Sequence, residues 1–449
     1  MAELIISVSG LRGIVGVNLT PEVAMRYAAA YVADLPPGAI VITRDGRTTG
    51  RMLVDAVRAG LMAVGRDVID ADIAATPTTG VLVRRYQAVG GIQVSASHNP
   101  PEYNGLKLFG ADGAVISAAA GQPVLSRFTR DDSPKWVDYR KLGELRPCDD
   151  SLTDHLALVA ATVDVERIRD RAFHVLLDSN HGAGSLLGRR LLEQLGCKVT
   201  VLGGEPTGRF AHTPEPTAEN LADVSARAAA LKVDVGFCQD PDADRLALLD
   251  ETGYYVGEEY TLAVCLDHVL RSRSGPVVTN CSTSRMSQDI AAKHGVPFFR
   301  SAVGEANVTA EMRLRGAVFG GEGNGGPIDP RVGYVRDSFV GMALTLDSLA
   351  AQNKKLSQVV AELPRYAIHK TKLTLDRQRI PGAVAALKAR FSDARADELD
   401  GLRLDWNDRW LLVRASNTEP IVRAIAEAPT PAAAQQLCDD ALEIMSAAR

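Results

Sequence analysis

The stretch GIQVSASHNPP (residues 91–101) predicts a buried strand that ends in a stiff polar loop. Residues 91–94 read as the strand, and the two prolines restrict the backbone after it. Ser97 then lies at a strand end, flanked by His98 and Asn99, an arrangement typical of a fixed nucleophile with proton-transfer partners. A lone loop serine is more often a turn former or a cap, so the interpretation depends on the rest of the chain.

A second polar stretch, DPDADR (residues 240–245), lies between two apolar segments that read as strands. Its carboxylates stand at alternate positions, Asp240, Asp242 and Asp244. Three oxygen donors that turn toward one point suit a hard cation such as Mg²⁺, and Arg245 adds a planar cation suited to a phosphate oxygen. The alternative is an acidic surface turn, which the flanking strands disfavour.

The glycine-rich stretch GGEGNGG (residues 320–326) also follows a short apolar run. Glycine permits unusual dihedral angles and close approach of a ligand, and Glu322 and Asn324 are the side chains there that form directed hydrogen bonds. Such a loop is suited to sugar hydroxyls. A flexible linker is the alternative, and the intervening Glu and Asn argue against a featureless spacer.

Two further arginine-bearing segments complete the set. The stretch RASNTEP (residues 414–420) and the nearby Arg423 combine arginines, hydroxyls and backbone N–H groups, which suits a dianion, although a polar hairpin turn is the alternative. Near the N-terminus, SGLRG (residues 9–13) places Arg12 between glycines. Residues 44–47 form a turn that either supports the Ser97 site or is a simple connection.

In kind and in order, these five segments resemble the motifs of the α-D-phosphohexomutase family, whose members move a phosphoryl group between the 1- and 6-positions of a hexose. The resemblance covers essentially the whole chain. It implies that Ser97 carries the phosphoryl group and binds Mg²⁺ together with the three aspartates. It also implies a sugar-binding role for Glu322 and Asn324, and binding of the phosphate that is not reacting by Arg414, Ser416, Asn417, Thr418 and Arg423. Arg12, His98, Lys107 and Arg245 match positions close to the transferring group, with Lys107 as a proton shuttle.

By this resemblance, a phosphoserine at position 97 passes its phosphoryl group to a hexose monophosphate, and the bound hexose bisphosphate turns over before returning the other phosphate. The GEGNGG and DPDADR forms look most like an archaeal-type branch assigned to glucosamine phosphate. We therefore expect interconversion of glucosamine 6-phosphate and glucosamine 1-phosphate, with Glu322 favouring a protonated 2-amino group. Phosphomannomutase or phosphoglucomutase activity is the alternative. A Mg²⁺-dependent phosphatase and a silent sugar-phosphate-binding protein are the readings from other classes.

Length and composition agree with an enzyme of this kind. The 449 residues suffice for roughly three or four domains, each with its own core, and a net charge of −5 provides no general basic field for nucleic acid. The six cysteines lack metal-ligand spacing and read as reduced thiols. No secretion signal and no apolar run of about 18 residues is present, so we expect a cytoplasmic monomer or homodimer that acts on a small sugar phosphate without a membrane partner.

The order of strand-like and helix-like segments predicts an α/β fold of four units. Three related α/β units with mixed, mostly parallel sheets are followed by a C-terminal α+β unit with an antiparallel sheet. The expected boundaries place the phosphoserine loop in residues 1–150, the metal loop in residues 151–256, the sugar loop in residues 257–365 and the phosphate loop in residues 366–449.

Overall fold

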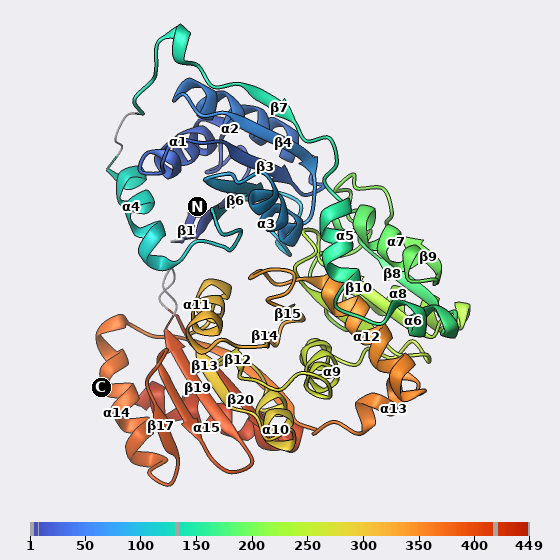
Figure 1. Cartoon of the computed structure of the whole chain (residues 1–449). Helices are drawn as coiled ribbons and strands as arrows, with labels where there is room; N and C mark the ends of the chain where they lie inside the picture. The colour runs from blue at the N-terminus through green and yellow to red at the C-terminus, as the bar shows by residue number, and fades with distance from the viewer. Residues whose placement is uncertain (1–3, 8, 131–133, 416–420, 448–449) are drawn as a thin grey trace.

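A computed structural model describes residues 4–7, 9–130, 134–415 and 421–447. These residues form four units, each built on one sheet: blue to teal at the top of Figure 1, green at the right, yellow to orange in the middle and orange-red at the lower left. None of the described helices is long and apolar enough to span a membrane. All six cysteines are free, and five of them are buried.

The first unit has a seven-stranded sheet in the order β1-β2-β6-β5-β3-β4-β7. β3, β4, β5 and β7 run parallel, whereas β1, β2 and β6 add antiparallel pairs, so the sheet is mixed. Helix α2 packs on it through Leu53, Val57 and Leu61, an apolar stripe at helical spacing. The elements are β1 (Ile5–Ser7), β2 (Gly10–Ile14), α1 (Pro21–Val32), β3 (Ile40–Arg44), α2 (Gly50–Ala63), β4 (Val68–Ile73), α3 (Thr76–Arg85), β5 (Gly90–Val94), β6 (Tyr103–Gly110), α4 (Ala118–Thr129) and β7 (Leu145–Pro147).

The second and third units each have a four-stranded sheet with three parallel strands and one antiparallel edge strand. The orders are β11-β10-β8-β9 and β13-β12-β14-β15. The second unit contains α5 (Thr153–Ala160), α6 (Val165–Arg171), β8 (His174–Asp178), α7 (Gly184–Gln194), β9 (Lys198–Leu202), α8 (Ala222–Leu231), β10 (Val235–Gln239) and β11 (Leu246–Leu249). The third contains α9 (Glu258–Leu270), β12 (Val277–Asn280), α10 (Met286–Lys293), β13 (Phe298–Ser301), α11 (Glu305–Arg315), β14 (Phe319–Glu322), β15 (Gly326–Ile328), α12 (Ser338–Gln352) and α13 (Leu356–Ala361).

The second and third units share one hydrophobic core. Leu187 and Phe237 of the second unit belong to the same buried cluster as Phe339 and Leu346 of α12 in the third. Helix α12 is apolar almost all round and is buried from Ser338 to Leu349, as expected for a helix packed between two units.

Each of these two units also has a smaller buried cluster of its own, which includes Leu176 in the second unit and Met312 in the third. The largest core, however, is common to both units, because a helix that follows the third sheet fills the space between them.

The fourth unit is a five-stranded antiparallel sheet in the order β16-β20-β19-β18-β17. Thr430 caps the last helix, because its Oγ1 accepts a hydrogen bond from the backbone N–H of Ala433. The elements are β16 (Ala367–Thr374), α14 (Ile380–Arg390), β17 (Arg395–Asp397), β18 (Leu402–Asp405), β19 (Trp410–Ala415), β20 (Ile421–Ala428) and α15 (Pro431–Ala447). The predicted fold class is thereby confirmed, and the short edge strand β17 is an addition to it.

Polar contacts join the units around the middle of the molecule. His155 of α5 lies between Thr78 of α3, 2.9 Å from its Nδ1, and Asp337 at the start of α12, 2.7 Å from its Nε2. These contacts connect the first three units.

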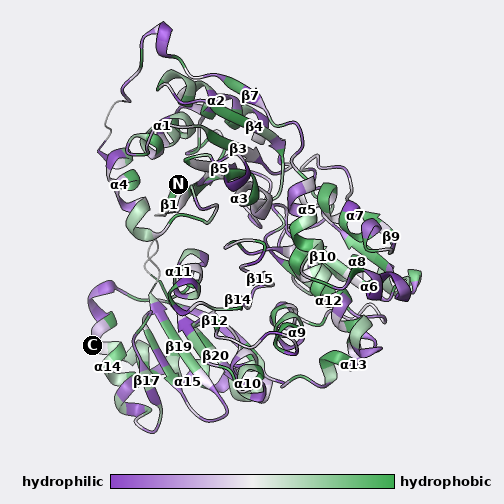
Figure 2. Cartoon of the chain, in the orientation of Figure 1, coloured by the Kyte–Doolittle hydropathy of each residue, from purple (hydrophilic) through white to green (hydrophobic). Residues whose placement is uncertain are grey.

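Figure 2 shows the hydrophobic colour gathered on the sheets of the first and second units, where β5 and β10 are buried throughout. The polar loops at the strand ends are therefore held by rigid, fully buried strands.

Candidate active site

The loop after β5 holds Ser97 in a fixed and buried position. Ser97 has φ of 51°, in the left-handed region that non-glycine residues rarely adopt. Its backbone N–H donates to Ser95 Oγ, which in turn donates to Asp45 Oδ2. The buried guanidinium of Arg47 donates to four backbone carbonyls of this loop, those of Ser97, Asn99, Pro100 and Tyr103. The turn at residues 44–47 therefore supports the Ser97 loop.

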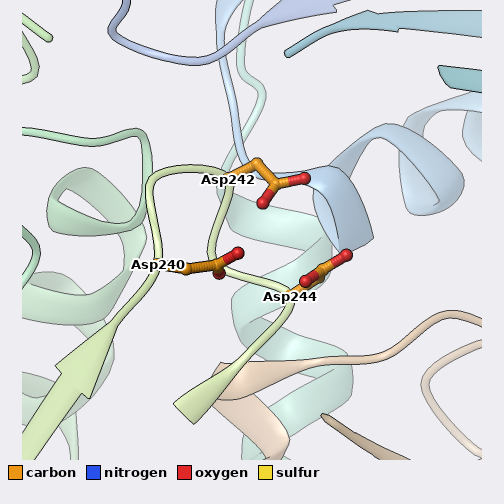
Figure 3. A group of neighbouring side chains, drawn as sticks. All are labelled: Asp240, Asp242 and Asp244. Atoms are coloured by element: carbon orange, nitrogen blue, oxygen red, sulfur yellow. The ribbon is translucent and has the colours of Figure 1, made fainter. Parts of the chain in front are cut away.

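The loop after β10 brings three carboxylates together. Asp240, Asp242 and Asp244 are fully buried, and one oxygen from each lies within 4.8 Å of the others. Figure 3 shows the three side chains extending from this one loop into the same region. Among the residues the structure describes, Asp242 Oδ1 and Asp244 Oδ1 have no hydrogen-bond partner. Buried carboxylate oxygens without a donor fit a cation that supplies the missing contacts.

Ser97 and the three aspartates meet although they come from different units. Ser97 Oγ donates a hydrogen bond to Asp240 Oδ2 at 2.7 Å, and it lies 3.3 Å from His98 Nδ1. Thr76, the first residue of α3, secures the same junction by donating to Asp242 Oδ2 at 2.6 Å. The predicted convergence of the hydroxyl with the acidic loop is present in the structure.

Two cations balance the acidic loop. Lys107 of β6 lies 2.8 Å from Asp244 Oδ2 and 3.2 Å from Asp242 Oδ2. Arg336, which precedes α12, pairs with Asp244 at 2.6 Å and with Glu322 at 2.7 Å. The loop of the second unit is thereby tied to the first unit by a lysine and to the third by an arginine.

Arg12 and Arg245 lie beside this centre. Arg12 NH1 donates to Asn99 Oδ1 at 3.0 Å, which holds the guanidinium next to the Ser97 loop. Arg245 Nε is 4.0 Å from Asp244 Oδ1, and its backbone N–H donates to Asp240 Oδ1. Both guanidinium groups therefore lie next to the loops that hold Ser97 and the three aspartates.

The ionisation of these groups reflects burial and the charges that lie around them. Burial, together with Asp242 and Asp244, raises the pKa of Asp240 well above its ordinary value. Burial acts in the same direction on Asp242, but Lys107 and hydrogen bonds lower its pKa below the ordinary value. Burial and two nearby arginines lower the pKa of His98 to about 3, so this imidazole is neutral at physiological pH.

A cavity of about 670 Å³ opens from this centre between the units. Its walls include His98 and Arg245 on one side, Glu322 and Asn324 of the glycine-rich loop, and Arg414 and Arg423 of the fourth unit. Residues from four separate sequence motifs therefore face one space large enough for a small ligand. Ser416, Asn417 and Thr418 lie outside the described residues.

Glu322 is held by the protein itself. Its Oε1 accepts hydrogen bonds from Asn280 Nδ2 at 2.7 Å and from the Gly304 backbone N–H at 3.2 Å, while Oε2 faces Arg336. The charge of this carboxylate is thus already compensated. The expectation that Glu322 supplies free negative charge for an amino group is therefore not supported by its contacts.

Four family models for phosphoglucomutase/phosphomannomutase match the chain in order. Alpha/beta/alpha domains I, II and III match residues 4–135, 153–253 and 257–366, and the C-terminal domain matches residues 371–444. The chain belongs to this family. The resemblance inferred from the five motifs is confirmed, and the protein is a phosphohexomutase, an enzyme of the isomerase class.

Full-length relatives carry two different names. A phosphoglucomutase/phosphomannomutase from Thermococcus kodakarensis is 37% identical, with 98% of each chain covered. A probable phosphoglucosamine mutase from Methanopyrus kandleri is 32% identical over 97% of this chain and 96% of that protein. A solved phosphoglucomutase/phosphomannomutase family protein from Burkholderia thailandensis has a TM-score of 0.82 and 27% identity, with 99% of both chains covered.

Several residues of this phosphohexomutase site were not predicted. Arg336 stands alone in a loop, and no local pattern marks it as the partner of two distant acids. Glu258 and Glu259, at the start of α9, line the cavity, as do Lys370 and Lys372 on β16. The alternation Lys370-Thr371-Lys372 in a predicted strand was the available signal, because it places both lysines on one face of that strand.

Proposed function

We propose that this phosphohexomutase moves a phosphoryl group between O6 and O1 of a hexose through a phosphoserine at Ser97 and a bound hexose bisphosphate. The observation that carries the proposal is the 2.7 Å contact between Ser97 Oγ and Asp240, inside a buried acidic cluster and beside the cavity wall. A hydroxyl held this way, with arginines on the open side, fits a carrier of a transferring anion.

The acidic loop fits Mg²⁺. Asp240, Asp242 and Asp244, with an oxygen of phosphorylated Ser97, would hold the ion. Two of these buried carboxylate oxygens lack donors among the described residues, and burial together with the neighbouring carboxylates raises the pKa of Asp240. When bound, Mg²⁺ supplies charge neutralisation on the phosphoryl oxygens. The oxygen-only donor set agrees with the preference of this hard cation.

The chain's own groups supply the proton transfers. The hexose hydroxyl forms a bond to phosphorus, the bond from phosphorus to Ser97 Oγ breaks, and the hydroxyl proton passes to neutral His98. Lys107, kept protonated because Asp242 and Asp244 raise its pKa against the effect of burial, returns a proton to Ser97 Oγ. Arg12 and Arg245 neutralise charge that develops on the phosphoryl oxygens.

The far side of the cavity serves the phosphate that is not reacting. The bisphosphate must turn over so that its other phosphate meets Ser97, and a clamp about one sugar length away holds the first phosphate in either orientation. Arg414 and Arg423, with Ser416, Asn417 and Thr418 of the same segment, are proposed for this clamp. A phosphatase has no need for such a second anion site.

For the sugar, we propose glucosamine 6-phosphate and glucosamine 1-phosphate. Glu322 is paired with Arg336, but Glu258 and Glu259 also line the cavity and form no ion pair among the described residues. Burial and Glu427 raise the pKa of Glu259 to about 8, which means that ionising this carboxyl group costs free energy. A protonated amino group bound beside it would offset that cost. Glucose or mannose phosphate is the second candidate, favoured by the name of the 37% identical relative.

The substrate assignment is tested by kcat/KM on the 6-phosphates of glucosamine, glucose and mannose. We expect glucosamine 6-phosphate to be favoured by at least about tenfold, the scale of one charge-assisted hydrogen bond. Equal or better turnover of glucose or mannose 6-phosphate would transfer the assignment to the second candidate. Release of inorganic phosphate in place of an isomerised sugar would indicate a phosphatase, and binding without turnover would indicate a silent binding protein.

Removal of divalent cations is expected to lower turnover by at least about a hundredfold, because three buried carboxylates would then repel the phosphoryl group. The measurement is kcat after dialysis against a chelator, followed by titration with Mg²⁺. Activity that survives complete chelation, with metal analysis confirming removal, would contradict the assignment of the acidic loop.

A further inference from the structure

Three cations stand in one row across the sheet of the fourth unit. In the antiparallel register, Lys372 of β16 is directly opposite Arg423 of β20, and Arg423 is directly opposite Arg414 of β19. Side chains of directly opposed residues project from the same face of a sheet. All three residues line the cavity of about 670 Å³.

The alternation of buried and exposed residues shows which face of the sheet carries the three cations. Val422 and Ala424, the neighbours of Arg423 along β20, belong to the hydrophobic core of the fourth unit, as does Val413 beside Arg414. Helix α15 packs on β16 and β20 from that side. The three cations therefore occupy the opposite face, which is turned to the cavity, and Lys372 is exposed there.

Few carboxylates neutralise the positive charges of this row. Arg414 Nε pairs with Asp400 Oδ1 at 2.8 Å, whereas Lys372 and Arg423 have no carboxylate partner among the residues the structure describes. Like charges directly opposite one another on adjacent strands are destabilising. A row of this kind at the wall of a cavity points to an anionic ligand that offsets the repulsion.

Asp400 also fixes the row relative to the third unit. Its Oδ2 accepts a hydrogen bond from the backbone N–H of Val303 at 2.9 Å, and the next residue, Gly304, donates to Glu322 of the sugar loop. The position of Arg414 is therefore fixed relative to the glycine-rich loop that contains Glu322. Lys372, at the other end of the row, extends the anion site beyond the predicted motif.

We propose that Lys372 binds the non-reacting phosphate of the substrate together with Arg414 and Arg423. The inference rests on the proposed mutase function and adds a residue to the clamp. The two planar guanidinium groups recognise phosphate oxygens in fixed directions, whereas an ammonium on a flexible stem is a point charge with rotatable donors. The lysine ammonium can therefore follow the phosphate as the bisphosphate binds in either of its two orientations.

The test is the Lys372→Gln variant, assayed with glucosamine 6-phosphate and with glucose 6-phosphate. We expect KM to rise by about tenfold or more while kcat changes by less than about threefold, because the lost contact is made equally before and during the reaction. The inhibition constant for inorganic phosphate as a competitor should rise in parallel. Lys372→Arg should keep KM within about threefold of the wild-type value, because the positive charge is retained.

Lys198→Gln is the matched control. It removes the same charge from an exposed strand position of β9, outside the cavity, and should leave KM unchanged. Lys372→Gln should fold with an unchanged or higher Tm, because one repelling charge is lost.

The outcomes separate the two proposals. A wild-type protein that isomerises no hexose phosphate would overturn the proposed function. An active wild-type protein whose Lys372→Gln variant keeps KM and phosphate inhibition within about twofold would overturn the role of Lys372 alone, as would a variant that fails to fold.

Discussion

Replacement of Ser97 by alanine is expected to lower kcat on every hexose phosphate by at least about a thousandfold, because the group proposed to carry the phosphoryl is removed. The substitution deletes one oxygen from a buried loop whose backbone is held separately by Arg47. The fold should therefore persist. The measurement is kcat for isomerisation, with a thermal melt of the same preparation to show that the variant is folded.

Ser446→Ala, on the C-terminal helix and outside the cavity, is the matched control and should retain wild-type turnover. A folded Ser97→Ala variant with more than about a tenth of wild-type activity would exclude a covalent role for this hydroxyl, since nucleophile removal costs far more in enzymes of this kind.

Replacement of Arg336 by methionine is expected to lower the free energy of unfolding by about 3–5 kcal/mol, the range for a buried ion pair that loses one partner. Arg336 is buried and pairs with Asp244 and Glu322, and its backbone N–H donates to Glu305. The substitution leaves the buried Glu322 without its cation and Asp244 with Lys107 as its nearest cation. Urea unfolding of both proteins measures the difference.

Arg315→Met is the comparison for that experiment. Arg315 pairs with Glu311 one turn away on the exposed face of α11, and such surface pairs contribute about 0–1 kcal/mol. If Arg336→Met destabilised the protein no more than Arg315→Met does, the arginine would not be the electrostatic link between the acidic loop and the glycine-rich loop that its contacts indicate.

The parts of the site that sequence reasoning predicted are those encoded by contiguous residues at strand ends. Asp240, Asp242 and Asp244 share one short loop, so their convergence requires no knowledge of tertiary structure. Ser97 was predicted from its position after a buried strand, and its contact with Asp240 follows from two strand-end loops that meet. The fold class followed from the alternation of strands and helices.

What the sequence did not reveal depends on pairings between distant segments. Arg336 gains its role only because the loop before α12 passes between Asp244 and Glu322. Lys372 becomes part of a cationic row only through the register of three strands, which no local pattern encodes. The shared core of the second and third units likewise arises from where α12 packs, a property of the assembled units.

The central claim is that Ser97 is the phosphoryl carrier, and the most direct measurement is peptide mapping after incubation with a phosphorus-labelled hexose 1,6-bisphosphate. We predict label on the peptide that contains Ser97, followed by its transfer into sugar when unlabelled hexose 6-phosphate is added. Isomerisation that proceeds with no label on that peptide, or with label on another residue, would contradict the account.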